Sequence, residues 1–360
     1  MLSIKKISSS DKKFSENLKN NILQRKFNTS DIKDKVKDII SEVRKNGDEA
    51  LIKFSSKYDN YSIDNAKDLE IPKEKFLEAL GKISKEELKA LKYAKKRIEE
   101  FASHQKSKSW DYTSEEIKLG EKITPINKVG IYVPGGSAVY PSSVLMNAVP
   151  AKVAGVKEII MVVPSPNGEV NNLVLAAAHL GGVDRLFRIG GAHAIAALAI
   201  GTNTIPKVNM IVGPGNQYVA EAKKELYGEV GIDSFAGPSE ILIIADSKAN
   251  ISWIVADLFS QAEHDVLAQS ILISPDKDLL KKVEEHILKE LPNQERKGII
   301  KESLQNFGLL INSKNIEEAI KISNDLAPEH LQMSVENSED YLDKIENAGA
   351  IFLGEYTPEV

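Results

Sequence analysis

Charged and apolar residues alternate at helical spacing in the first third of the chain. Between residues 30 and 47 the apolar positions recur every three or four residues, at Ile32, Val36, Ile39, Ile40 and Val43, which is typical of one buried helix face. Ser30 is placed to cap this helix and Gly47 to end it. The stretch DEALIKFSSKYD and the Lys- and Glu-rich residues 74–104 repeat the pattern, so this region is predicted to be helical.

From residue 129 onward, short β-branched runs alternate with glycine and proline turns and with alanine-rich helical stretches. About eight runs are strand-sized, among them KVGIYV, EIIMVV, ILIIAD and SILISP. This alternation predicts an α/β fold, with mostly parallel sheets flanked by helices. The number of strands and the chain length favour two Rossmann-like lobes, together with an N-terminal helical segment.

Glycine- and proline-rich turns cluster near residues 131 and 238, and they are the most plausible boundaries. We therefore expect a helical arm over residues 1–29 and an inserted lobe over residues 132–238. Residues 30–131 and 239–360 are expected to form the other lobe together.

Composition and charge narrow the class of protein. The chain is 42% hydrophobic and 28% charged, and its net charge of −5 gives no basic excess for binding nucleic acid. The N-terminus has no apolar leader and the apolar runs are strand-sized, so no membrane segment is expected and the protein is expected to be cytoplasmic. The absence of cysteine excludes disulfides and thiolate chemistry. A metal would need His, Asp, Glu, Gln or water as ligands.

Four glycine turns are candidates for holding a cofactor: YVPGGSA (132–138), RIGGAHA (188–194), IVGPGNQY (211–218) and FAGPSE (235–240). If all four follow strands at one sheet edge, their backbone N–H groups could approach a pyrophosphate. None has the G-x-G-x-x-G pattern, so each alone is equally well explained as a tight connection. Their polar residues leave similar alternatives open. Asn216 and Ser239 could be helix caps, Tyr132 could be core, and His193 begins an alanine-rich helix.

Two further groups could carry chemistry. Gln261 and His264 are three residues apart on the predicted last turn of a helix, so both could reach one ion, although two ligands do not make a metal site. The ordinary alternative is a polar helix end. Glu329 and His330 follow Pro328, which holds them on a rigid turn as a candidate acid and base pair. Adjacent Glu and His are also common by chance.

Taken together, these stretches resemble the histidinol dehydrogenase family along nearly the whole chain. The resemblance includes RKNGDEALIKFSSKYD, VGIYVPGGSAVYPSSVLMNAVPAKVAGV, GGAHAIAALAIGT, VGPGNQYVAEAK, FAGPSEILIIAD, SQAEHD and APEHLQ, in the family's order. It implies a zinc-dependent oxidation of L-histidinol to L-histidine through the aldehyde level, with two NAD per turnover, by a homodimer.

The resemblance also implies roles for individual residues. It makes Gln261 and His264 zinc ligands that also contact substrate, with Ser239 as a further substrate contact. His330 becomes the general base, also in contact with substrate, and Glu329 activates water for the second oxidation. The NAD contacts are expected at Tyr132, His193 and Asn216. The 132–238 lobe would then bind NAD, and the other lobe would carry the zinc and catalytic residues.

Two departures from the family pattern change these expectations. His193 stands where the family usually has glutamine. The chain also ends at AIFLGEYTPEV, before the family's Gly-Asp-Tyr motif, its remaining zinc aspartate and histidine, its substrate glutamate and its dimer-swapped C-terminal domain. We therefore expect weak zinc binding, little activity and an uncertain dimer for these 360 residues.

Two alternatives to this function stay open. One is a relative that oxidises another small polar alcohol. The other is a scaffold without catalytic activity, which the joint retention of Gln261, His264, Glu329 and His330 disfavours.

Overall fold

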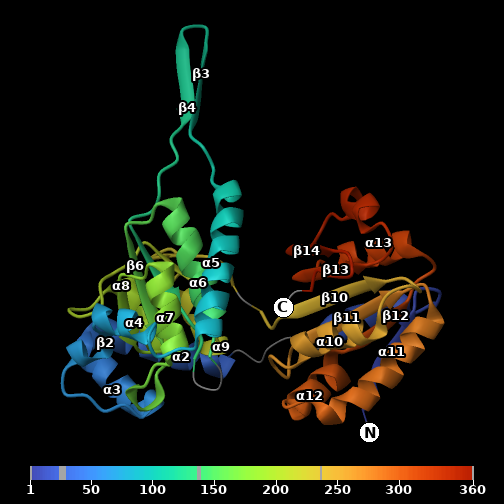
Figure 1. The fold of residues 1–360 in the computed structure, drawn as a ribbon, viewed down its shortest axis with the longest axis horizontal. Coiled ribbons are helices and arrows are strands. Elements are labelled where there is room, and N and C mark those ends of the chain that lie inside the picture. Colours follow the sequence, from blue (N-terminus) through green and yellow to red (C-terminus); the bar gives the residue numbers. More distant parts are fainter. Residues whose placement is uncertain (1, 24–29, 136–138, 236, 359–360) are drawn as a thin grey trace. The chain divides into compact units, whose positions relative to one another are not determined.

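The structure, a computed structural model, describes residues 2–23, 30–135, 139–235 and 237–358. The chain forms two compact units. We call Met1–Phe27 with Gly237–Val360 the terminal unit, and Asn28–Ala236 the central unit. Each unit is built on its own six-stranded sheet with helices packed against it (Figure 1). The predicted α/β class is confirmed.

The central sheet has the strand order of a doubly wound fold. Its strands, in spatial order, are β2 (Glu70–Ile71), β7 (Arg185–Arg188), β6 (Glu158–Val163), β5 (Lys128–Tyr132), β8 (Met210–Val212) and β9 (Gly231–Ile232). All neighbours are parallel except β2 and β7. The chain adds β6 and β7 on one side of β5 and then β8 and β9 on the other. The connections therefore reverse between β5 and β8, where such sheets commonly bind ligands.

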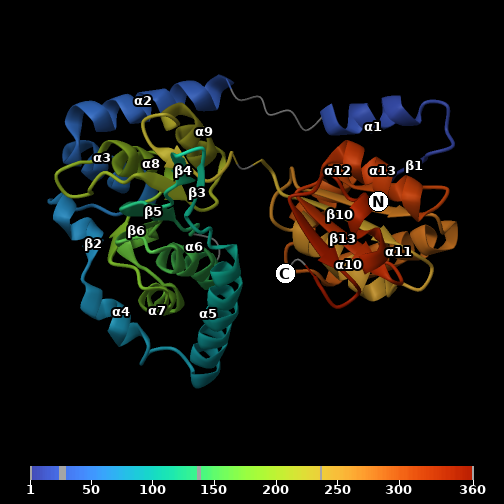
Figure 2. The same cartoon turned by 90° about the horizontal axis from the view of Figure 1, so that it is seen from above.

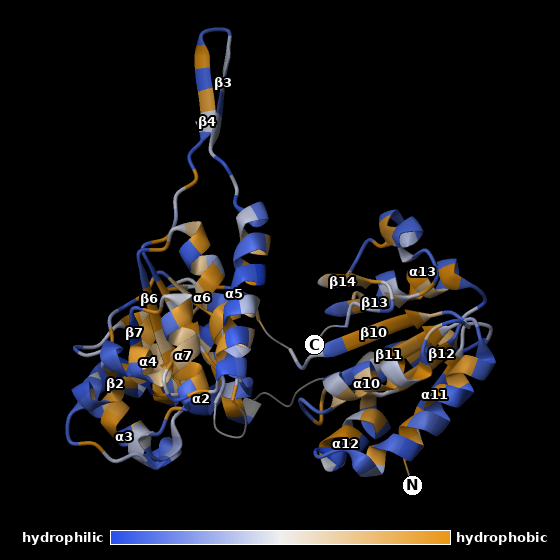
Figure 3. Ribbon diagram, in the orientation of Figure 1, coloured by the Kyte–Doolittle hydropathy of each residue, from blue (hydrophilic) through white to orange (hydrophobic). Residues whose placement is uncertain are grey.

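Helices cover both faces of the central sheet, as Figure 2 shows. On one face lie α2 (Ser30–Asn46), α3 (Asp48–Asp59), α8 (Gly191–Ile200) and α9 (Gln217–Leu226). On the other lie α4 (Lys73–Ala79), α5 (Lys85–Gln105), α6 (Pro141–Ala154) and α7 (Asn172–Gly181). The side chains of β6 alternate between the two cores, because successive strand residues point to opposite faces. Figure 3 shows the resulting apolar interior and polar outer helix faces.

A two-stranded hairpin projects from the central unit (Figure 1). It consists of β3 (Trp110–Ser114) and β4 (Ile117–Glu121), which pair antiparallel, and every residue of both strands is exposed. The sequence pattern did not predict it.

The terminal sheet is entirely parallel. Its strands, in spatial order, are β1 (Lys5–Ser8), β12 (Leu309–Asn312), β11 (Gln269–Ser274), β10 (Glu240–Ala245), β13 (His330–Ser334) and β14 (Ala350–Leu353). Its helices are α1 (Phe14–Leu23), α10 (Ile251–Ala262), α11 (Lys277–Glu290), α12 (Lys297–Phe307) and α13 (Ile316–Leu326). Ile241 and Ile243 of β10 face one core, and Leu242 and Ile244 face the other.

Short 3₁₀ helices complete the two units. They are η1 (Ala66–Leu69) and η2 (Pro166–Gly168) in the central unit and η3 (Leu291–Asn293) and η4 (Ser338–Lys344) in the terminal unit.

The predicted assignment of residues 30–131 was wrong. They belong to the central unit with residues 132–236, and not with residues 239–360. Helices α2 and α3 bury their apolar faces against α8 and the central sheet, and β5 pairs with β6 and β8. Only the predicted boundary near residue 238 matches the start of the second part of the terminal unit.

The N-terminal segment also differs from the predicted helical arm. Before α1 the chain forms β1, which extends the terminal sheet beside β12. Residues 24–29 and the side chain of Ser30 lie outside the described part, which leaves the predicted cap untested. No helix among the described residues is long and apolar enough to span a membrane.

Candidate functional site

The three residues predicted to contact NAD line one cavity in the central unit. Tyr132 ends β5, His193 lies in the first turn of α8 after β7, and Asn216 follows β8. They meet at the carboxyl edge of the sheet, where a cavity of about 690 Å³ lies beside the reversal between β5 and β8. This volume is in the range of ligand sites. Residues 136–138 of the first glycine turn lie outside the described part.

The hydroxyl of Tyr132 holds the glycine turn that begins α8. The backbone N–H of Gly191 donates to this hydroxyl over 3.1 Å. Gly191 has a φ of +64°, in the left-handed region that favours glycine. Burial raises the pKa of Tyr132 to about 12, so its hydroxyl keeps its proton at neutral pH. Tyr132 is therefore both core, at 2% exposed, and part of the cavity wall.

His193 is buried among aromatic rings. Its ring centroid lies 5.3 Å from that of Phe54 and 5.8 Å from that of Tyr58. Burial lowers its pKa to about 3, so the imidazole is neutral at physiological pH. Its Nε2 is buried without a hydrogen-bond partner among the described residues. The residue lines the cavity, but most of its ring contributes to packing.

Asn216 is a helix cap, the alternative that the sequence left open. Its Oδ1 accepts hydrogen bonds from the backbone N–H groups of Tyr218 and Val219, over 3.1 and 3.2 Å. The turn before it lies close against β5, since a Cβ at Gly213 would overlap the backbone oxygen of Tyr132. Capping fixes the side chain at the cavity that it also lines.

Sequence reasoning missed one cavity residue. Asp59, the last residue of α3, lines the same cavity and is 8% exposed. Burial raises its pKa to about 6, and the backbone N–H of Gly190 donates a hydrogen bond that partly offsets this effect. Asp59 follows no strand and belongs to no glycine turn. Spacing in the sequence therefore gave no signal for it.

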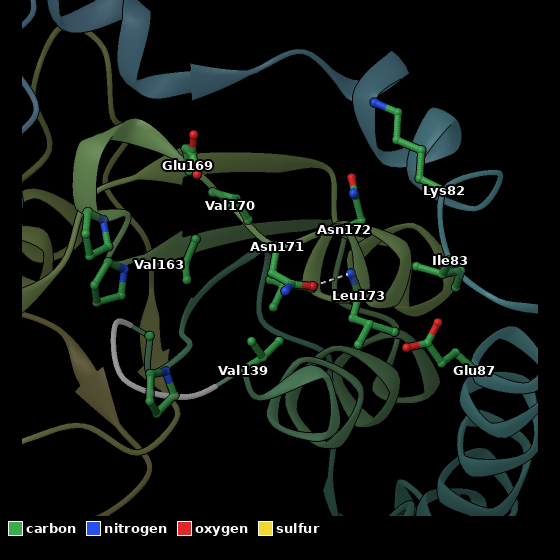
Figure 4. A pocket seen from close by; sticks show the side chains of 15 residues that line it. Lys82, Ile83, Glu87, Val139, Val163, Glu169, Val170, Asn171, Asn172 and Leu173 are labelled. Carbon is green, nitrogen blue, oxygen red and sulfur yellow. Dashed lines mark hydrogen bonds between the residues drawn. The ribbon is translucent and has the colours of Figure 1, made fainter.

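A second cavity of about 580 Å³ adjoins the first, because Pro134, Gly135 and Pro164 line both. Figure 4 shows its side chains, including Lys82, Glu87 and Asn172. Asn171 caps α7 here by accepting a hydrogen bond from the backbone N–H of Leu173 over 2.8 Å. None of the predicted site residues lines this cavity.

The other predicted residues lie at the amino edge of the terminal sheet. Ser239 immediately precedes β10, and His330 begins β13 and pairs with Ile241. Helix α10 returns from the carboxyl edge and brings Gln261 and His264 to the start of β11. The prediction of four glycine turns at one carboxyl edge was therefore wrong for FAGPSE. That turn, of which residue 236 lies outside the described part, leads into a strand.

The backbone of Glu240 positions both residues of the candidate acid and base pair. The Nδ1 of His330 lies 2.9 Å from the Glu240 carbonyl oxygen. A carbonyl can only accept, so Nδ1 carries the proton and the neutral ring keeps its lone pair on Nε2. The backbone N–H of Glu240 donates to Oε2 of Glu329 over 3.2 Å. His330 is thus prepared to take a proton at Nε2.

Gln261 and His264 are not on the same helical turn, contrary to the prediction. Helix α10 ends at Ala262, and the backbone N–H of His264 donates to the carbonyl of Gln261 over 3.2 Å in the turn that follows. Gln261 is 2% exposed and His264 is exposed. No group of three or more His, Cys, Asp or Glu in the described ranges could hold a metal. These two side chains alone do not complete a zinc site, which needs at least three protein ligands.

Comparison with known proteins agrees with the resemblance seen in the sequence. The family model described as histidinol dehydrogenase matches residues 23–360. A histidinol dehydrogenase from Methylococcus capsulatus is 51% identical, over 99% of this chain and 82% of the relative. One from Nitrosospira multiformis is 49% identical, over 100% of this chain and 82% of the relative.

Solved structures give the same result. The crystal structure of histidinol dehydrogenase from Elizabethkingia anophelis matches with a TM-score of 0.92 and 35% identity, over 100% of this chain and 82% of that one. Aldehyde dehydrogenase 21 from Physcomitrella patens matches with a TM-score of 0.51 and 12% identity, over 95% of this chain and 81% of that one, which shows a shared fold alone. The chain therefore belongs to the histidinol dehydrogenase family and is an oxidoreductase.

Proposed function

We propose that this chain oxidises L-histidinol to L-histidine in two successive steps, each with NAD as the acceptor. The observation that carries the proposal is the pair His330 and Glu329, both hydrogen-bonded to the backbone of Glu240 at the start of β10. In this arrangement the Glu329 carboxylate lies 3.8 Å from Nδ1 of His330, and Nε2 is the proposed base. The family relatives carry the name of this activity.

The cavity of the central unit suits NAD. Tyr132 and Tyr218 line it, and Lys35 and Lys57 bring positive charge for phosphates. Within the described part of the chain, buried polar atoms on Asp59 and His193 lack partners, which is the condition in which a polar ligand adds hydrogen bonds. Bound there, NAD supplies the acceptor for the hydride that leaves the substrate carbon. Tyr132, His193 and Asn216 are the proposed contacts.

His330 is the proposed general base of both oxidations. In the first, Nε2 takes the alcohol proton as the C–H bond breaks, which leaves the aldehyde. His330 then passes that proton to solvent. In the second oxidation, Glu329 accepts a proton from the water that adds to the aldehyde, and the deprotonated His330 takes the remaining hydroxyl proton of the adduct. Loss of the second hydride gives the carboxylate of histidine. Ser239 is proposed to hold substrate at the same sheet edge.

For zinc, we propose Gln261 and His264 as two ligands, also placed to contact substrate. No group of three or more His, Cys, Asp or Glu among the described residues could hold a metal, so these two ligands do not complete a zinc site by themselves. We derive no step through the metal. The proposed assembly is a homodimer acting in the cytoplasm on a small-molecule substrate.

Replacement of His330 tests this assignment. His330→Asn keeps a hydrogen-bond donor for the Glu240 carbonyl but removes the base, so we expect kcat to fall at least about 100-fold with little change in KM. NADH formation from L-histidinol in the presence of zinc is the measurement. His104→Asn, on the exposed surface of α5, is the control. Equal kcat in the His330 variant and in the wild type would remove His330 from the mechanism.

The two alternatives make different predictions in the same assay. A relative with another substrate would form NADH with a different small polar alcohol and not with L-histidinol. A scaffold without activity would form none with any alcohol, whatever the residue at position 330.

A further inference from the structure

Asp59 occupies a position that is unfavourable for a carboxylate. It ends α3, where the helix dipole is negative and disfavours a second negative charge. Its side chain is 8% exposed, and its Oδ2 is buried with no hydrogen-bond partner among the residues that the structure describes. Burial raises its pKa to about 6, which shows that the folded chain resists its ionisation. An uncharged residue at this position would make the folded state more stable, so stability alone does not explain why the residue is an aspartate.

The neighbours of Asp59 belong to the cofactor cavity. The backbone N–H of Gly190 donates to its carboxylate, and the N–H of the next residue, Gly191, donates to the hydroxyl of Tyr132. These two N–H groups begin α8 and would otherwise be available to a phosphate. Because both N–H groups already donate hydrogen bonds within the protein, they are not available to bind a phosphate. The cavity is lined here by the carboxylate of Asp59. The positive charges of the cavity come from Lys35 and Lys57.

This polarity identifies the part of a dinucleotide that fits next to Asp59. A carboxylate accepts hydrogen bonds and repels phosphate, so its ligand has to be a neutral donor. The ribose hydroxyls are such donors, and a ribose is joined directly to the phosphates that the lysines attract. We infer that Asp59 accepts hydrogen bonds from the 2′- and 3′-hydroxyls of the adenosine ribose and thereby selects NAD over NADP.

This inference rests on the proposed use of NAD, and it adds the residue that distinguishes NAD from NADP. Bound NAD gives the buried Oδ2 a hydrogen-bond donor. NADP places a phosphate carrying up to two negative charges in the same position, against a carboxylate that is shielded from water. The carboxylate belongs to α3, and every strand of the central sheet follows α3 in the sequence. It therefore differs in origin from the acid found downstream of a dinucleotide fingerprint.

The test is binding of NAD, NADP and 2′-deoxy-NAD to the chain by calorimetry, without substrate or zinc. Asp59→Asn keeps an acceptor for the Gly190 N–H and removes the charge. Asp38→Asn removes one charge from the exposed surface of α2 and is the matched control. Thermal unfolding checks that the Asp59 variant remains folded, which we expect because it loses a buried charge.

In the wild type we expect NAD to bind on the order of 100-fold more tightly than NADP and about tenfold more tightly than 2′-deoxy-NAD. Asp59→Asn should reduce both ratios to within a few-fold of one, and the control should keep them. Unchanged ratios in Asp59→Asn would overturn the inference and leave Asp59 only the role of holding the Gly190 turn. If the wild type binds none of the three dinucleotides, the proposed cofactor fails and this inference fails with it.

Discussion

At the scale of single residues, His193 shows how burial can oppose a role inferred from position. It lies where the resemblance implies an NAD contact, and it does line the cavity. Its ring is nevertheless packed on Phe54 and Tyr58 and its pKa is lowered to about 3. The family's usual glutamine would not titrate at this position, so the histidine should make folding depend on pH.

The sign of this dependence follows from the two pKa values. His193 titrates near 6.5 in the unfolded chain and near 3 in the folded chain. Below pH 6.5 the unfolded chain binds a proton that the folded chain does not, so stability falls as the pH drops. Between pH 7 and pH 5 the loss is about 2 kcal/mol. His193→Gln should remove this part of the loss, as measured by urea unfolding at both values.

The exposed His104 provides the control for this measurement. His104→Gln should lose as much stability between pH 7 and pH 5 as the wild type does. If His193→Gln also behaves like the wild type, the imidazole at position 193 is protonated in the folded chain and its burial has been misjudged.

Single residues also show how far the sequence could lead to the site. The sequence places Tyr132, His193 and Asn216 in glycine turns near the ends of strands, but it was the family resemblance that grouped them as NAD contacts. Asp59 could not be predicted, because only the packing of α3 brings it to the cavity that they line. The tautomer of His330 could not be predicted either, since it depends on the carbonyl of Glu240 in a neighbouring strand.

At the scale of elements, a buried polar contact joins the two elements that carry Gln261 and His330. Nε2 of Gln332, on β13, donates to Oδ2 of Asp257, on α10, over 2.8 Å. Asp257 is 9% exposed, and burial raises its pKa. Removing this donor would leave the buried carboxylate without compensation for the hydration that it loses on folding.

Gln332→Met removes that donor and leaves the carboxylate of Asp257 buried. We expect the free energy of unfolding to fall by about 2 kcal/mol at pH 8. The loss should be smaller at pH 4, where more of the carboxyl is protonated and needs no compensating donor. Urea unfolding at the two pH values measures it. The double variant Asp257→Leu with Gln332→Met should be more stable at pH 8 than Gln332→Met alone, because it no longer buries an unpaired carboxylate. If the two substitutions instead lower the free energy of unfolding additively, the two side chains are not coupled.

Helices and strands differed in how well they could be predicted. Helices α2, α3 and α5 follow the expected apolar spacing, because each buries one face. Strand β1 has four residues, too few for a periodic signal, and it is defined by its pairing with β12. The hairpin β3–β4 buries no face, so it has no core-facing run that could indicate strands.

At the scale of the whole molecule, the α/β class and the boundary near residue 238 could be read from the chain, and the grouping of its parts could not. Glycine turns mark the ends of strands, but they do not show which sheet a strand joins. Residues 30–131 belong with the central sheet because the apolar face of α2 packs on α8 and because β5 lies between β6 and β8. Such pairing between distant segments is decided by the fit of their surfaces.

The central claim concerns the whole reaction, and one measurement tests it most directly. L-histidinol, NAD and zinc are supplied to the protein, and NADH and L-histidine are both quantified. The account predicts two NADH for each histidine formed. One NADH with accumulation of the aldehyde would contradict the proposed second oxidation, and no NADH at all would contradict the proposed activity.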